Sequence, residues 1–219
     1  DGILIIDKPA GITSHDVVAR VRRALKTRRV GHTGTLDPFA TGVMVVLVGK
    51  ATRLAQFLDK DEKEYTATVR FGFETDTGDV TGSRTTDCGL RNEDVAAMLD
   101  KVDWVSVLQK FQGEIQQVPP MYSAKKVEGK RLYELARKGI EIERNAVTVT
   151  IHKLEIAASE LHALHSELRF RVTCSAGTYI RTLAEDIGRA VGLGAHLTEL
   201  RRTRAGRFAI DDAVSLDEL

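Results

Sequence analysis

The sequence predicts an α/β protein of the α+β kind, built on a mixed sheet. Residues 63–71 and 167–175 alternate between apolar and polar side chains, which is typical of half-buried strands. Residues 2–7 and 43–48 are short apolar runs and are expected to be buried strands. Helical patterns lie between these strands without a strict βαβ rhythm. A mixed sheet is therefore favoured over a doubly wound parallel one.

The N-terminal part combines a strand, a capped helix and a glycine-rich loop. Thr13 and Asp16 form a capping-box pattern, and the apolar residues after them recur at helical spacing. The elements expected here are a strand at 2–7, a turn at 8–11, a helix to about residue 25, a loop at 30–42, a strand at 43–48 and a helix at about 51–58.

The remaining elements follow from the same two periodicities. Strands are expected at 63–71, 146–156 and 167–175, helices at 92–99, 104–111, 130–138 and 178–191, a polar loop at 72–83, and a short helix and an edge strand at 196–210.

Composition and charge indicate an ordinary globular protein. The chain has 219 residues, 42% of them hydrophobic and 29% charged, with a net charge of +1. No long apolar run or signal-peptide pattern occurs, so we expect a cytoplasmic protein with no membrane partner. Cys88 and Cys174 are expected to be free thiols, with Cys174 in the core. His162 and His165 have no further ligand residues beside them, so we expect surface residues and no metal site.

The positive charge is segregated along the chain. Residues 20–29 hold six basic side chains and residues 201–207 hold four, with no acid in either run. Such runs are usually solvated faces, but here glycine-rich turns lie beside them and favour a phosphate-binding surface. Residues 113–144 differ in character and are interpreted as an inserted arm. From Lys110 to Arg144 there are eight basic residues against five acids.

Asp37 is the candidate for chemistry. It precedes Pro38, which disfavours helical geometry and so favours an exposed carboxylate in the loop. Arg181 lies in the first turn of a helix, the unfavourable end of the dipole for a cation. It therefore has an anionic partner, which could be Asp37, or it is a surface arginine. Tyr65 is a candidate ring-stacking residue, or a core residue with a satisfied hydroxyl. Asp-Pro is also a common turn dipeptide.

Several motifs in sequence order resemble the TruB family of bacterial tRNA pseudouridine-55 synthases. The resemblance covers almost the whole chain. It implies the pseudouridine synthase fold, with a mixed, largely antiparallel central sheet flanked by helices and an inserted RNA-binding arm. The motifs that carry it are DKPAGITS at 7–14, GHTGTLDP at 31–38, KEY at 63–65, VPPMYSA at 118–124, GTYIRTL at 177–183 and LRR at 200–202.

The resemblance implies an isomerase that converts a tRNA uridine into pseudouridine without a cofactor. Asp37 would be the essential carboxylate. It would attack C1′, promote a glycal while stabilising an oxocarbenium-like centre, or add to C6, and the sequence leaves all three routes open. Arg181 would pair with Asp37, and Tyr65 would stack on the uracil and move a proton. Lys8 and Pro9 would support that tyrosine.

The resemblance also implies how RNA is held. The target uridine must be flipped out of the T-loop, and His32 would fill the space that it leaves. Leu200 would line the pocket, and Tyr179 belongs to the motif around Arg181. The arm would contact phosphates through four basic residues: Lys125, Lys126, Lys130 and Arg131.

Family members usually continue into a small C-terminal PUA domain, whereas this chain ends at Leu219. We therefore expect residues 1–219 to form the catalytic domain alone. The expected enzyme is a monomer with tRNA as its partner and no required protein partner. The alternatives are a tRNA-folding chaperone, a guide-RNA-dependent synthase and a plain RNA-binding domain.

Overall fold

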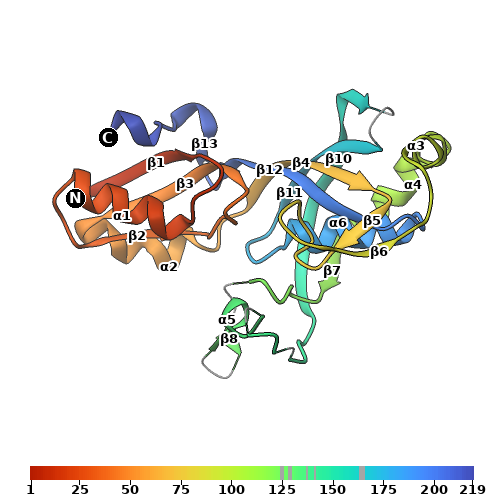
Figure 1. Cartoon of the computed structure of the whole chain (residues 1–219). Coiled ribbons are helices and arrows are strands. Elements are labelled where there is room, and N and C mark those ends of the chain that lie inside the picture. The colour runs from red at the N-terminus through yellow and green to blue at the C-terminus, as the bar shows by residue number, and fades with distance from the viewer. Residues whose placement is uncertain (124–125, 128–129, 137, 141, 163–165) are drawn as a thin grey trace. The chain divides into compact units, whose positions relative to one another are not determined.

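The computed structural model describes residues 1–123, 126–127, 130–136, 138–140, 142–162 and 166–219 (Figure 1). Nine strands form one sheet in the order β1-β3-β12-β4-β11-β10-β7, with β2 beside β3 and β13 beside β12. The pairs β1/β3, β2/β3, β7/β10 and β12/β13 are antiparallel, and β3/β12 is parallel. The expected fold class, a mixed sheet with helices, is confirmed.

The chain divides into two compact units. Unit 1 comprises residues 1–66, 172–176 and 199–219, and unit 2 comprises residues 67–171 and 177–198. Three strands run through both units: β4 (Lys63–Phe71), β11 (Glu167–Cys174) and β12 (Ala195–Ala205).

Unit 1 holds the N-terminal strands and their helices. Its elements are β1 (Gly2–Lys8), α1 (Ser14–Ala24), β2 (Val30–Thr33), β3 (Thr41–Val48), the 3-10 helix η1 (Gly49–Leu54), α2 (Ala55–Leu58), β13 (Phe208–Ala209), and the 3-10 helices η3 (Ile210–Asp212) and η4 (Leu216–Glu218).

Unit 2 holds the remaining helices and the edge of the sheet. Its elements are β5 (Phe73–Thr75), β6 (Arg84–Asp87), α3 (Asn92–Leu99), α4 (Trp104–Gln109), β7 (Gly113–Gln117), β8 (Lys126–Val127), β9 (Lys130–Arg131), α5 (Leu132–Ala136), β10 (Val147–His162) and α6 (Ile180–Ala190).

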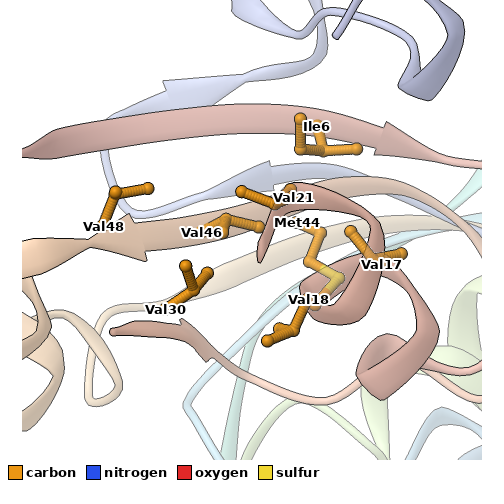
Figure 2. Close-up of a cluster of buried hydrophobic side chains, with 8 residues drawn as sticks. All are labelled: Ile6, Val17, Val18, Val21, Val30, Met44, Val46 and Val48. Carbon is orange, nitrogen blue, oxygen red and sulfur yellow. The ribbon is translucent and has the colours of Figure 1, made fainter. Parts of the chain in front are cut away.

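The core of unit 1 forms between α1 and the strands beside it. The expected capping box begins the helix, since the Thr13 side chain accepts from Asp16 N–H and the Asp16 carboxylate accepts from Thr13 N–H. The apolar face of α1 then packs on residues of β1, β2 and β3 (Figure 2). Burying each such side chain stabilises the unit by about 1.5–3 kcal/mol. The cluster comprises Ile6, Val17, Val18, Val21, Val30, Met44, Val46 and Val48.

The register of β1 against β3 determines which residues lie at each end of these two strands. Gly2 lies opposite Val48, and Lys8 lies opposite Gly42. Lys8 therefore stands at the end of the sheet where β3 begins, beside the loop of residues 34–40. A side chain at position 42 would collide with β12, because a Cβ there would lie 2.2 Å from the carbonyl oxygen of Arg202. Glycine is required at this crossing.

Several expected elements need correction. Residues 195–205 form the long strand β12, where a short helix and an edge strand were expected. Its pairing with β3 joins residues about 160 positions apart in the chain, and such non-local contacts override local pattern. Residues 30–33 of the expected loop form β2, and the expected helix at 51–58 is a 3-10 helix followed by one α-helical turn.

The predicted arm also begins later than expected. Its first five residues form β7, which pairs with residues 147–151 of β10. Of residues 118–146, those that the structure describes lie outside the main sheet. None of the helices in the described part of the chain is long and apolar enough to cross a membrane.

Candidate active site

The loop of residues 34–40 carries Asp37 between β2 and β3. Within its own backbone, the Ala40 amide donates to the Asp37 carbonyl at 3.1 Å. The Gly11 amide donates to the Pro38 carbonyl at 2.8 Å. The chain here has left the sheet, so other groups must satisfy its polar atoms. Buried side chains from three separate elements supply those partners.

Ser14 and Lys8 fix the loop on either side of Asp37. The Ser14 hydroxyl donates to the Leu36 carbonyl at 3.0 Å and accepts from the Leu36 amide at 2.9 Å. The Lys8 ammonium donates to the carbonyls of Ala40 at 2.7 Å and Pro38 at 3.2 Å. Both side chains are buried. The backbone on each side of the carboxylate is thus held in place before any substrate binds.

Arg202 is the third support, and the sequence analysis did not single it out. Its guanidinium is 1% exposed and donates to the carbonyls of Val43 at 2.7 Å and Gly34 at 2.9 Å. Its positive charge also acts on the Tyr65 hydroxyl. One side chain therefore ties the start of the Asp37 loop to β3 and places a positive charge beside the candidate stacking residue. Period-2 alternation places Arg202 on the same face of β12 as Leu200, and that signal would have marked it as buried.

Most arginines of the run at 201–207 have partners within the protein. Arg201 forms an ion pair with Asp7 at 2.7 Å, and Arg204 forms one with Glu62 at 2.7 Å. Arg202 is buried. Three of the four arginines thus have partners within unit 1, and phosphate binding by this run stays a prediction.

Tyr65 is a buried residue of β4 with electrostatic contact to the site. Burial raises the pKa of its hydroxyl, while the charge and hydrogen bond of Arg202 oppose the rise. The phenol is therefore protonated at neutral pH. Asp37 is close enough to raise the pKa of Tyr65 further.

The pKa of Lys8 is set by burial and by nearby charges of both signs. Desolvation lowers the pKa of its ammonium to about 8, with the Arg202 charge adding to this and Asp37 opposing it. At pH 7 the ammonium is still mostly charged. Attraction between Lys8 and the Asp37 carboxylate stabilises both ions in this partly dehydrated place.

His32 lies in β2 with an unused polar atom. Its Nδ1 is buried and has no hydrogen-bond partner in the described part of the chain. Burial, followed by the charge of Arg202, lowers the pKa of the imidazole, so the ring is neutral at pH 7. An unpaired buried nitrogen normally has a ligand or water partner. Leu200, 6% exposed in β12, and Pro9, whose carbonyl accepts from Lys8 at 3.0 Å, also belong to unit 1.

Arg181 lies in unit 2 and is buried, which excludes the surface-arginine alternative. It donates to the carbonyls of Thr77 at 2.6 Å and Tyr122 at 2.7 Å. Its Nε lies 3.8 Å from Oδ2 of the buried Asp79, an anionic partner of the kind expected. Asp37 belongs to the other unit, and its pairing with Arg181 stays a prediction.

The residue before the helix that carries Arg181 is held by two hydrogen bonds from one side chain. The Gln117 amide accepts from the Tyr179 N–H at 3.0 Å and donates to the Tyr179 carbonyl at 3.3 Å. The predicted phosphate contacts of the arm stay predictions. Lys125 lies outside the described residues, as does His165, and Lys126, Lys130 and Arg131 are placed only as backbone of β8 and β9.

Comparison with known proteins identifies the family of the chain. A family model for the N-terminal domain of TruB family pseudouridylate synthase matches residues 22–180. A second model, for the tRNA pseudouridylate synthase B C-terminal domain, matches residues 181–219.

Individual relatives match over the whole chain. A tRNA pseudouridine synthase B from Aromatoleum aromaticum is 51% identical over 219 residues, covering 100% of this chain and 68% of the relative. One from Bordetella avium is 47% identical, with 86% of the relative covered. The solved structure of a Cbf5-Nop10-Gar1 complex contains a chain that is 34% identical with a TM-score of 0.71, and this chain covers 53% of it. The chain belongs to the TruB family of pseudouridylate synthases.

Proposed function

We propose that this protein is a stand-alone tRNA pseudouridine synthase that isomerises uridine 55 in the T-loop. The observation that carries the proposal is the Asp37 loop, whose carboxylate is flanked by backbone held by Ser14, Lys8 and Arg202. The support of a reactive group by buried hydrogen-bonding residues is what a catalytic site requires. Identity of 46–51% to several curated tRNA pseudouridine synthase B proteins supports the substrate.

The reaction rearranges bonds within one nucleotide. The N1–C1′ bond breaks, the uracil turns, and C5 bonds to C1′. The hydrogen on C5 is then released as a proton, and N1 carries a proton in the product. Asp37 acts on C1′, on glycal formation or on C6. Tyr65 is a phenol that stays protonated at neutral pH, which suits it to proton movement at the ring.

Access to the nucleotide requires that the base leave the T-loop stack. His32 fits the role of occupying that space, because it offers a neutral ring with an unpaired buried nitrogen. The arm and the shape of the RNA contribute affinity that falls as salt rises. We further propose that the enzyme acts in the cytoplasm as a monomer, with no protein partner required.

A T-arm stem-loop labelled with tritium at C5 of the target uridine tests the proposal. The wild-type protein alone should release tritium and convert the target into pseudouridine, with no guide RNA present. A stem-loop whose other loop uridine carries the label is the control and should release none. Binding without tritium release would indicate an RNA-binding protein or a chaperone and would refute the proposal.

A further inference from the structure

A group of cations gathers at the end of α1 and is not used by the proposed site. We call it the basic turn. The Arg29 carbonyl accepts from the Gly49 amide at 2.7 Å, and the Arg29 Nε donates to the Thr52 hydroxyl at 3.1 Å. These contacts bring the connection after α1 beside η1. The exposed cations of the basic turn are Arg23, Lys26, Arg28, Arg29, Lys50 and Arg53.

The charge of the basic turn is not neutralised internally. Within the described residues, none of its six cations forms an ion pair with a carboxylate. The acid at its edge is Asp1, whose carboxylate accepts from the Lys50 amide at 3.0 Å. Two neighbouring arginines are not counted in the basic turn, because they have partners in the protein. The Arg22 guanidinium donates to the Val30 carbonyl at 2.9 Å, and Arg20 interacts electrostatically with the Asp16 carboxylate. Six uncompensated charges in a chain of net charge +1 form a local positive field that favours a polyanion.

Lys26 adds a second, independent observation. It follows the C-cap Leu25 and has φ = +49°, in the left-handed region. Glycine or asparagine normally takes this position, because a longer side chain is disfavoured there. The helix dipole does not require the lysine, since Arg22 and Arg23 already lie in the last turn. Lys26 therefore presents a cation from a strained backbone position at the end of α1.

The basic turn is remote from the Asp37 loop. Helix α1 begins at Ser14, which bonds Leu36 in that loop, and ends at Ala24. Eleven residues span about 16 Å at 1.5 Å per residue. The β1–β3 register agrees, because Lys8 and Gly42 lie at the loop end and Gly2 and Val48 at the other. A nucleotide flipped toward Asp37 cannot touch the basic turn, whereas a continuous RNA backbone can reach both.

We propose that the basic turn is a second RNA-contact site, which binds phosphates of tRNA outside the T-loop. The inference rests on tRNA being the substrate. Phosphate contacts of this kind position the RNA without reading its bases. Loss of the site therefore weakens binding and leaves turnover at saturating tRNA unchanged.

The first test compares two variants of equal net charge. One is Arg28→Gln with Arg53→Gln, and the control is Lys101→Gln with Lys110→Gln, which removes two exposed cations from unit 2. Affinity for full-length tRNA is measured by fluorescence anisotropy over a range of salt concentrations. The slope of log K against log salt should fall by about 0.9 for each phosphate that the variant no longer neutralises. The control should keep the wild-type slope. Equal slopes in both variants would overturn the proposal.

The second test separates charge from fold at one residue. Lys26→Gly and Lys26→Asn suit the left-handed backbone, so the thermal midpoint should rise in both. Affinity for tRNA should fall at the same time, with a shallower salt slope. A merely structural residue would not lower affinity while raising stability. Unchanged affinity in both variants would overturn the proposal. Failure of the proposed function would instead appear as absent turnover in the wild type, a readout separate from binding.

Discussion

Arg202 gives the sharpest test of how the Asp37 loop is held, through the substitution Arg202→Met. Methionine keeps much of the length and removes the charge and the donors. The carbonyls of Gly34 and Val43 then lose their partners in a buried place. Each unsatisfied group costs about 1–3 kcal/mol. Part of this cost is offset, because the variant no longer has the repulsion between Arg202 and Lys8 and no longer buries a charged guanidinium.

The net loss of unfolding free energy should be about 3 kcal/mol. For a chain of this size that loss lowers the thermal midpoint by roughly 6–12 °C. The turnover number should fall by about a hundredfold, because a small displacement of the reacting group has that effect. Calorimetry and urea denaturation give the stability, and tritium release at saturating tRNA gives the turnover.

Arg204→Met is the matched control, on the same strand. Arg204 pairs with Glu62 at 2.7 Å, with both side chains partly exposed. Its removal should cost no more than about 1 kcal/mol, with turnover retained. If Arg202→Met is as stable and active as Arg204→Met, the role assigned to Arg202 is wrong.

Three further predictions follow from the same contacts. Because burial lowers the pKa of Lys8 to about 8, the unfolded chain binds more protons between pH 8 and 10.5, so stability should rise with pH across that window. The free energy of unfolding should rise by roughly 3 kcal/mol in total, and this rise should be absent in Lys8→Met. Urea unfolding of both proteins at pH 7.5 and 10 measures it, and equal pH dependence of the two would contradict the prediction. Asp79→Asn breaks the buried pair with Arg181 and should lower the free energy of unfolding by about 3 kcal/mol, as calorimetry would show. Most of the turnover should be lost while binding assays show unchanged affinity for tRNA. Tyr65→Phe should lower turnover about a hundredfold with unchanged tRNA affinity, and wild-type turnover would remove the hydroxyl from the mechanism.

Local pattern predicted much of unit 1 correctly. The apolar runs and the capping residues Thr13 and Asp16 determine their own local structure, so β1, α1 and β3 lie close to their expected positions. Periodicity also placed Cys174 in the core, where it is 1% exposed. These features depend on contacts between residues near in sequence, or on simple alternation.

The supports of the site were harder to predict, because they are long-range contacts of buried charged groups. Arg202 reaches Gly34 and Val43 from the far end of the chain. The charge of a basic run does not show which arginine turns inward, and the alternation with Leu200 indicates this only once residues 195–205 are known to form a strand. For Arg181 the sequence left open a surface position, yet the residue is 3% exposed. A helical stripe counts apolar residues and misses a buried cation whose partners are distant carbonyls and Asp79.

The central claim is that Asp37 performs the chemistry and contributes little to RNA binding. The most direct measurement is a single-turnover experiment with excess Asp37→Asn enzyme on tRNA labelled with tritium at C5 of the target uridine. The affinity of the same preparation is measured in parallel. We expect wild-type affinity and no tritium release. Tritium release at the wild-type rate would contradict the role assigned to Asp37.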